Sequence, residues 1–247
     1  MTPLLEISGA TKRFGAVEAL VDVDLIVNHG EVVALAGDNG AGKSTLIKAI
    51  SGVQPADAGH VSFEGRQVHI RGPHDASSLG IAVVYQDLAL CDNLDVVANL
   101  FLGAEEREGA IRLMDEIGME EEATTLLRSL SVRLPSVRAE VGTLSGGQRQ
   151  SVAISRALLG EPKLVILDEP TAALGVSQTQ QVLELVLRLK ERGLGVLIVS
   201  HNLADVFQVA DRIVVLRLGR NAGELAADAA NHQAVVAAIT GAAGVIA

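Results

Sequence analysis

The chain has 247 residues, enough to bury a hydrophobic core within one α/β domain that carries a subdomain. Its formal net charge is −10, from 20 basic and 30 acidic side chains, which argues against a protein whose main partner is a nucleic-acid backbone. One cysteine excludes an internal disulfide, and the sequence has neither a signal-peptide pattern nor an uncharged apolar run of membrane-spanning length. We therefore expect a soluble, cytoplasmic chain whose membrane role, if it has one, comes through a partner.

The apolar residues are mostly aliphatic, since 49% of the chain is hydrophobic and only 2% is aromatic. Short runs of Val, Leu and Ile suit strands that are covered on both faces, as in parallel sheets. Near the N-terminus, residues 4–7 and 21–27 alternate instead, which predicts half-buried antiparallel strands with a turn at 12–15 between them. Residues 61–65 and 67–70 predict a small hairpin around Gly65.

The most informative stretch follows the apolar run 32–36 and leads into a helix predicted to begin near Lys43. It reads Gly37-Asp38-Asn39-Gly40-Ala41-Gly42-Lys43-Ser44-Thr45. Its glycines let backbone N–H groups point toward a phosphate, and the helix start adds its positive dipole end. Lys43 can reach the β- and γ-phosphates of a nucleotide, and Ser44 is placed to bind Mg²⁺. A glycine-rich turn that binds nothing is the alternative, but the strand before it and the helix after it favour nucleotide binding.

Residues 81–85 predict a buried strand ending at Gln86, and the hydrophobic pattern changes after it. From Asp95 to about Arg133 the pattern is helical and densely charged, with Ile111, Leu113 and Met114 among its apolar positions. We predict an inserted helical subdomain over about residues 87–160.

A second glycine-containing turn lies within this insert, before a helix predicted over residues 151–159. It reads Leu144-Ser145-Gly146-Gly147-Gln148. Backbone amides and a helix dipole at such a turn suit an anion. A simple capping turn explains Ser145 and one glycine, but not the pair.

Two further predicted strands end in polar residues. Residues 164–167 lead to Asp168 and Glu169, and residues 195–200 lead to His201. Ligand-binding groups of α/β sheets lie at such ends. There Asp168 can hold Mg²⁺ through water, Glu169 can deprotonate an attacking water, and His201 can hydrogen-bond a γ-phosphate.

By itself, an Asp-Glu pair would be interpreted as a polar cap of the loop after a strand. A lone His or Gln would be interpreted as a residue with a structural role. The phosphate loop upstream favours the functional interpretation. Helices are predicted over 177–191 and 202–209, a strand over 213–216, and an Ala-rich tail over 221–247.

In this order and spacing, the phosphate loop, Leu144 to Gln148, Leu164 to Glu169, and His201 resemble the ATP-binding cassette ATPases over residues 4 to about 220. The resemblance implies an α/β fold: a P-loop NTPase (RecA-like) core with an antiparallel β subdomain, over about 1–86 and 161–220, and the inserted α-helical subdomain. It also implies ATP and Mg²⁺ as cofactors. Two copies would sandwich ATP head to tail, with Ser145–Gln148 of one copy facing the other's phosphate loop.

Carried over by position, the resemblance assigns roles to single residues. It implies that Phe14 stacks on adenine, with an edge-strand core residue as the alternative. It implies that Gln86 contacts the metal and links the site to the helical insert. Asp168 would coordinate Mg²⁺ through water, Glu169 would be the catalytic base, and His201 would be the γ-phosphate switch.

One position departs from the family pattern. After Glu169-Pro170-Thr171 the family usually reads Ser-Ala-Leu-Asp, and that Asp reaches across the dimer. This chain has Ala172-Ala173-Leu174-Gly175 instead. Communication between the two nucleotide sites therefore lacks its usual side chain, although the hydrolytic residues are intact.

The resemblance implies a peripheral ATPase subunit on the cytoplasmic face of the plasma membrane. Its partners would be a second copy, integral permease subunits and, indirectly, a periplasmic solute-binding protein. Gly175 and residues 87–94 and 200–203 look like the cassettes of bacterial importers of simple sugars such as fructose, ribose or xylose.

Three alternatives stay open. The solute could be an amino acid or a lipid. A non-transport cassette protein acting on nucleic acid or the ribosome is the second, and the lack of long inserts or basic arms argues against it. The third is a regulatory module without turnover, against which Glu169 and His201 argue.

Overall fold

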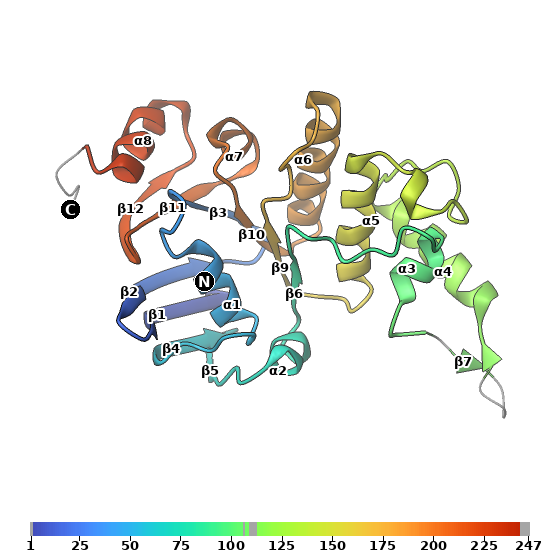
Figure 1. Cartoon of the computed structure of the whole chain (residues 1–247), viewed down its shortest axis with the longest axis horizontal. Coiled ribbons are helices and arrows are strands. Elements are labelled where there is room, and N and C mark those ends of the chain that lie inside the picture. The colour runs from blue at the N-terminus through green and yellow to red at the C-terminus, as the bar shows by residue number, and fades with distance from the viewer. Residues whose placement is uncertain (1, 106, 109–112, 243–247) are drawn as a thin grey trace.

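A six-stranded sheet runs through the centre of the computed structural model, which describes residues 2–105, 107–108 and 113–242 (Figure 1). The strand order is β12-β11-β3-β10-β9-β6. The strands are β3 (Val32–Ala36), β6 (Ile81–Val84), β9 (Leu164–Asp168), β10 (Gly195–Val199), β11 (Arg212–Arg217) and β12 (Arg220–Ala226). Neighbouring strands are parallel except β11 and β12, which are antiparallel. The prediction of a parallel sheet built from buried aliphatic runs is confirmed.

A four-stranded antiparallel sheet in the order β2-β1-β4-β5 lies beside it. Its strands are β1 (Leu5–Phe14), β2 (Val17–Val27), β4 (Ala58–Phe63) and β5 (Arg66–Val68). Both antiparallel predictions are confirmed, including the hairpin around Gly65. The turn predicted at 12–15 is wrong, because β1 continues to Phe14, which pairs with Val17. Only Gly15, with φ 59°, and its neighbour are needed for the turn.

The two faces of the central sheet are covered by different elements, as β3 illustrates. Val33 and Leu35 pack into a core shared with α1 and the antiparallel sheet. Val32, Ala34 and Ala36 point to the other face, into a core shared with α6 and α7. The helices around the sheet are α1 (Lys43–Ile50), α2 (Pro73–Ser78), α6 (Val176–Glu191) and α7 (Leu203–Val209). Burial on both faces explains why β3 is apolar throughout.

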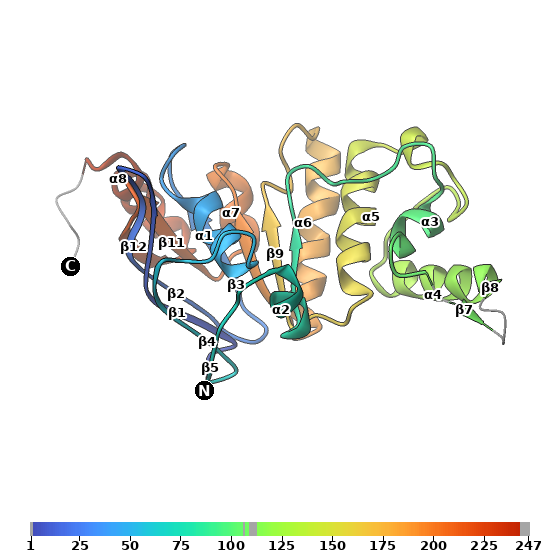
Figure 2. The same cartoon turned by 60° about the horizontal axis from the view of Figure 1, so that its bottom comes forward.

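A helical region lies at one end of the molecule, on the far side of α6 from α1 in both views (Figures 1 and 2). Its helices are α3 (Val96–Phe101), α4 (Glu116–Ser129) and α5 (Gly146–Leu158), with a 3₁₀ turn at Val141–Thr143. These elements share an apolar core of their own. Val152 of α5 belongs to that core, whereas Ile154 packs with the central sheet, so α5 joins the two parts.

One helical prediction in this region is wrong. Leu113 and Met114 form β8 (Leu113–Met114), which pairs with β7 (Arg107–Glu108). Gly103, with φ 82°, follows α3, and the side chain of Asp115 caps the start of α4. Ile111, predicted on the same helical face, lies outside the described residues.

The C-terminal segment, expected as an Ala-rich tail, carries regular structure. After β12 a 3₁₀ turn at Ala229–Asn231 leads into α8 (His232–Thr240). Val235 of α8 is fully buried in the core that covers the central sheet. The ring of His232 stacks on Phe207 of α7, with centroids 5.2 Å apart. In the described part of the chain, no helix has both the length and the apolarity that a bilayer crossing needs.

Candidate functional site

The phosphate loop connects β3 to α1 through three glycines with positive φ. Gly37, Gly40 and Gly42 have φ of 151°, 80° and 106°, a region that L side chains rarely adopt. A Cβ atom at Gly37 would overlap the carbonyl oxygen of Leu216, and one at Gly42 would lie 2.7 Å from that of Ala19. The loop is therefore packed against β11 and β2 so closely that a side chain fits at neither position.

Lys43 begins α1 and folds back over this loop. Its Nζ donates hydrogen bonds to the carbonyl oxygens of Gly37 at 2.6 Å and Asp38 at 3.1 Å, and the residue is buried. Ser44, which follows it, is exposed. The N-cap, Gly42, has no side-chain oxygen to accept from the first amides of α1. A bound phosphate can supply that acceptor.

The carboxyl ends of β3, β10 and β9 lie level with one another. Val199 of β10 pairs with Leu35 of β3 on one side and with Asp168 of β9 on the other. The phosphate loop, His201 and Glu169 follow these three strands directly or within two residues. They consequently meet at one edge of the sheet, as the sequence predicts.

Asp168 is the last residue of β9 and is half-buried. Burial raises the pKa of its carboxyl above the ordinary value of 3.8, and the charge of Glu169 raises it further. Lys43 and Lys48 of α1 act in the opposite direction. A cation bound beside this carboxylate would offset the cost of burying its charge.

Glu169 adopts a left-handed backbone, with φ 50°, which is uncommon for a residue other than glycine. Its N–H donates to the carbonyl oxygen of Val199 at 2.8 Å, which ties β9 to β10 at this point. Oε2 of Glu169 lies 2.9 Å from Nδ1 of His201. The side chain of Glu169 is 15% exposed and that of His201 is 68% exposed, so the imidazole reaches outward from a largely covered carboxylate.

Gln86 lies two residues beyond β6 and is exposed. Because the strand order is β3-β10-β9-β6, it is the strand-end residue farthest from the phosphate loop along the sheet. The adjacent Tyr85 donates its hydroxyl to Oγ of Ser51, just after α1, at 3.1 Å. Gln86 thus shares the edge of the sheet but borders the helical region.

The turn at Ser145–Gln148 forms the N-terminus of α5. The Ser145 hydroxyl accepts from the Gln148 N–H at 3.4 Å, and Oε1 of Gln148 accepts from the Ser145 N–H at 3.0 Å. A Cβ at Gly147 would lie 3.0 Å from the Cβ of Gln178 on α6, so this glycine permits close helix packing. In both views α5 lies across α6 from α1, so the turn does not meet its own phosphate loop (Figures 1 and 2).

Phe14 lies at the end of the β1–β2 hairpin with 44% of its surface exposed. Nζ of Lys12 lies 5.7 Å from the centre of its ring. The next strand, β2, approaches the phosphate loop at Ala19. The alternative of a core residue does not hold, because the ring is open to solvent.

A buried hydrogen bond behind this edge was missed by sequence reasoning. Oγ1 of Thr171 donates to Oδ2 of Asp205 at 2.7 Å, and both residues are buried. Thr171 follows Glu169 closely, and Asp205 lies one helical turn after His201. The bond therefore joins the two segments that carry the Glu169–His201 contact. The sequence signal for this bond was a charged residue, Asp205, next to the apolar Val206 in a predicted helix.

The second missed feature is the approach of α8 to the phosphate loop. A hollow of about 420 Å³ lies between them, lined by Asp38 and Asn39, by Ser200 and His201 and by the apolar edge of α8. An apolar repeat at 235, 236 and 239 was the signal for this helix.

Comparison with known proteins gives this arrangement a context. Residues 20–172 match the model of a family described as ABC transporter. The chain is 50% identical over 220 residues to the xylose/arabinose import ATP-binding protein XylG of Sulfolobus acidocaldarius, covering 89% of this chain and 87% of that protein. It is 46% identical over 224 residues to the fructose import ATP-binding protein FrcA of Rhizobium meliloti, covering 88% and 86%.

Solved structures are similar over nearly the whole chain. The ADP conformation of MJ1267, an ATP-binding cassette of an ABC transporter, has a TM-score of 0.85 at 30% identity, covering 98% of this chain and 100% of that one. The dimeric structure of MJ0796, a bacterial ABC transporter cassette, has a TM-score of 0.74 at 26% identity, covering 91% and 99%.

Proposed function

The chain belongs to the ABC transporter family, and we propose that it is the ATP-hydrolysing subunit of an importer of a simple sugar. The observation that carries the ATP-hydrolysing part of this proposal is the meeting of the phosphate loop, Asp168, Glu169 and His201 at one edge of the parallel sheet. The names of the relatives support the sugar part. The proposed residue roles are those implied by this geometry. Lys43 and the loop amides bind the β- and γ-phosphates of ATP.

Glu169 is proposed as the base of the hydrolysis step. Its carboxylate accepts a proton from water as the water oxygen attacks the γ-phosphorus, and the bond from that phosphorus to the bridging oxygen breaks. ADP and phosphate are the products. His201, in contact with Glu169, is placed to hydrogen-bond the γ-phosphate.

Mg²⁺ fits the donor set that this edge offers. Asp168 provides a carboxylate, Ser44 a hydroxyl and Gln86 an amide oxygen, and Mg²⁺ prefers such oxygen ligands together with phosphates and water. When bound, the ion supplies charge neutralisation to the phosphates. The raised pKa of Asp168 supports the assignment, because a neighbouring cation would relieve the burial of its charge.

A second copy of the chain is proposed to complete each site. The Ser145–Gln148 turn and the phosphate loop of one chain are separated by α6, so they cannot hold the same nucleotide. A head-to-tail pair would bring the turn of one copy to the loop of the other. The similarity to a dimeric cassette supports this pairing.

A groove of about 370 Å³ at the junction with the helical region is the proposed docking site of a permease. Its lining includes Ala76 of α2, Tyr85 beyond β6 and Ala157 of α5. Arg156 of α5 donates hydrogen bonds to the carbonyl oxygens of residues 88 and 89, at 2.8 Å each, which ties α5 to the segment after Gln86. A membrane partner in the groove would therefore sense both parts of the chain.

We propose the same domain boundaries that the sequence predicts. The core with its β subdomain comprises about residues 1–86 and 161–220, the helical subdomain about 87–160, and the C-terminal segment 221–247. We propose that the helical subdomain passes movement to the permease from the cytoplasmic face of the membrane. A periplasmic solute-binding protein would deliver the sugar, and the names of the xylose/arabinose and fructose relatives support a monosaccharide.

Two alternatives differ in solute or in class. An amino-acid or lipid importer would use the same nucleotide site, so the site does not favour it over a sugar importer.

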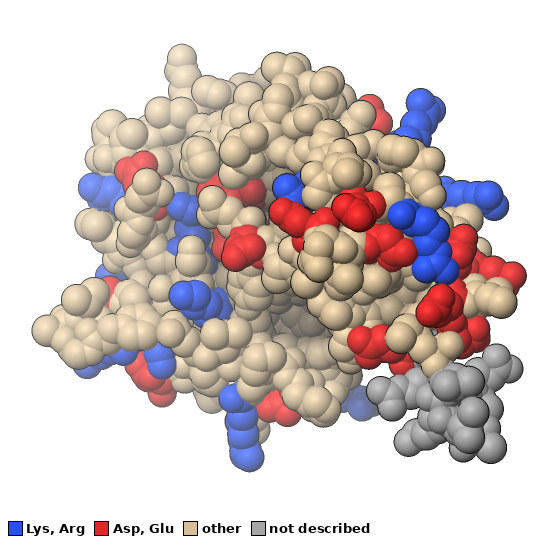
Figure 3. All heavy atoms as spheres, turned by 45° about the vertical axis from the view of Figure 1, so that its right-hand side comes forward, with Lys and Arg blue, Asp and Glu red and all other residues tan. Residues whose placement is uncertain are grey.

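A partner made of nucleic acid is disfavoured by charge. Figure 3 brings the helical region forward and displays Asp and Glu gathered there, where α4 carries Glu116, Glu120 and Glu121. Such a face repels a phosphate backbone.

The test is a pull-down of the tagged protein from detergent-solubilised membranes of its own cells, with mass spectrometry of what co-purifies. We expect a polytopic permease with the wild type, its loss with Ala157→Arg in the groove, and its retention with Ala229→Arg, a matched change at an exposed residue outside the groove. Ribosomal or DNA-associated proteins without a permease would contradict the transport function. Retention of the permease by Ala157→Arg would contradict the docking site.

A further inference from the structure

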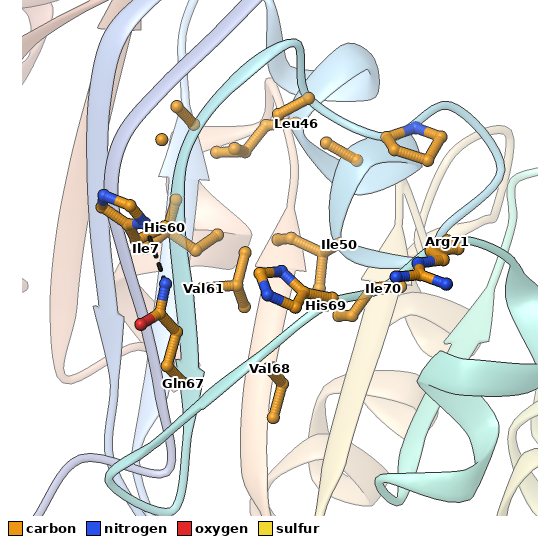
Figure 4. A pocket seen from close by; sticks show the side chains of 15 residues that line it. Ile7, Leu46, Ile50, His60, Val61, Gln67, Val68, His69, Ile70 and Arg71 are labelled. Carbon is orange, nitrogen blue, oxygen red and sulfur yellow. Dashed lines mark hydrogen bonds between the residues drawn. The ribbon is translucent and has the colours of Figure 1, made fainter.

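A hollow of about 290 Å³ lies between α1 and the β4–β5 hairpin (Figure 4). No phosphate-loop glycine lines it, so it is separate from the proposed nucleotide site. Its apolar lining includes Ile7, Leu46, Ile50 and Ile70, each at most 8% exposed. We propose that this hollow binds a small carboxylate with an apolar body.

The rim of the hollow carries nitrogen-bearing side chains. His60 and Gln67 stand at one side, joined by a contact of 3.0 Å between Nδ1 and Nε2. His69 lies between the two sides in this view, and Arg71 lies at the opposite side from His60 (Figure 4). No Asp or Glu is among the residues that line it, in a chain with 30 acidic side chains and a net charge of −10. The lining of the hollow thus lacks the acidic side chains that predominate in the chain, and it suits an anion.

Two of the rim residues have side-chain groups that are not engaged elsewhere, although the backbone N–H of Arg71 donates to Oδ2 of Asp75 at 2.9 Å. Within the residues that the structure describes, neither the Arg71 guanidinium nor the His69 ring has a hydrogen-bond or ion-pair partner. By contrast, Arg212 is held by Glu31 at 3.0 Å and by Glu224 at 2.7 Å. Arg71 is therefore free to bind a carboxylate through its planar fork of donors.

Size and lining together define the ligand class. The volume lies just below the usual range for ligand pockets, which favours a short chain or a single ring over a nucleotide. Burial of a hydrocarbon body against the apolar lining is favourable, and Arg71 and His69 bind the carboxylate. Leu46 and Ile50 belong to α1, the helix that begins at Lys43, so the ligand would contact the element that also carries the phosphate loop.

Hexanoate is the probe for the test, and hexanol is its neutral counterpart. Calorimetric titration should give saturable binding of hexanoate to the wild type. Arg71→Gln should weaken that binding about tenfold, as expected for loss of a charge-assisted hydrogen bond. Arg66→Gln is the matched control, because Arg66 lies on the same hairpin, is exposed and does not line the hollow. It should leave the affinity unchanged, and hexanol should bind more weakly than hexanoate.

The ring signals of the histidines give an independent readout of position. The chain has 6 histidines, and hexanoate should shift those of His60 and His69 in a proton–nitrogen NMR spectrum. Absence of saturable binding would overturn the proposal, as would equal weakening by both arginine variants. Equal affinity for hexanol, or shifts confined to other histidines, would overturn it too. Circular dichroism of each variant verifies that folding is intact.

Discussion

Nδ1 of His201 lies 2.9 Å from Oε2 of Glu169, across the ends of the neighbouring strands β10 and β9. The proposed base and the proposed γ-phosphate switch are therefore in direct contact. If His201 binds the γ-phosphate as proposed, that phosphate would compete with the carboxylate of Glu169 for the imidazole, and the contact would link ATP binding to the end of β10.

Lys43→Ala should abolish ATP hydrolysis and weaken ATP binding by about tenfold or more, because a charge-assisted contact to the phosphates is lost. The variant also loses the two hydrogen bonds that Lys43 donates to the loop. Lys163→Ala is the control, since the ammonium group of Lys163 pairs with Glu64 at the surface. Turnover assays and fluorescent-nucleotide titration measure both effects, and unchanged turnover in Lys43→Ala would refute the phosphate-loop assignment.

Glu169→Gln should reduce hydrolysis by about 10²-fold or more while retaining ATP, as expected when a general base is removed. An ATP-bound dimer should then accumulate and be visible by size-exclusion chromatography with light scattering. Glu184→Gln, on the exposed side of α6, serves as the control. Persistent monomers that hydrolyse ATP normally would remove Glu169 from the role of base.

Asp168→Asn should separate stability from activity. The folded-state pKa of Asp168 is raised, so the folded chain binds more protons than the unfolded chain in the window just above 3.8. Stability from this group is present at low pH and falls as pH rises through the folded-state pKa. In buffer with EDTA, the variant should therefore melt above the wild type at pH 7, and the gap should close as pH falls toward 3.8.

Loss of Mg²⁺-dependent hydrolysis should accompany this gain in melting temperature. A variant that melts below the wild type at pH 7 would contradict the role of burial at Asp168. Full hydrolysis would contradict its role as a metal ligand.

Gly175→Asp introduces the residue that the family resemblance implies at this position. Nothing lies within 4 Å of a Cβ built there, and φ is −74°, so the side chain fits. Gly175 caps α6, where Asp is also a good N-cap, and the melting temperature should stay equal or rise slightly. We expect the Hill coefficient for ATP to change, measured in steady-state assays. Identical Hill behaviour would mean that the position does not link the two sites.

The gathering of the site at one edge of the sheet could be predicted because aliphatic runs and polar strand ends are local features of the sequence. The contact between Glu169 and His201 could not, since it depends on the register of Val199 with Asp168 and on the left-handed backbone of Glu169. The hydrogen bond from Thr171 to Asp205 likewise joins segments that only the fold brings together.

The prediction of secondary structure failed where pairing or packing with a distant segment determines the element. Phe14 is in a strand because Val17 pairs with it, not because of its own surroundings. Leu113 and Met114 have helical spacing but pair with β7 as a ribbon. The helix α8 was hidden by an alanine-rich composition, and its buried Val235 is fixed by the core that it covers.

The measurement that tests the central claim most directly is uptake of radiolabelled solutes by cells that lack this gene. Xylose, arabinose, fructose and ribose would be compared with a panel of amino acids. We predict that uptake of at least one monosaccharide is lost, and that it is restored by the wild-type gene but not by Lys43→Ala. Unchanged uptake of every sugar, or loss confined to amino acids, would contradict the account.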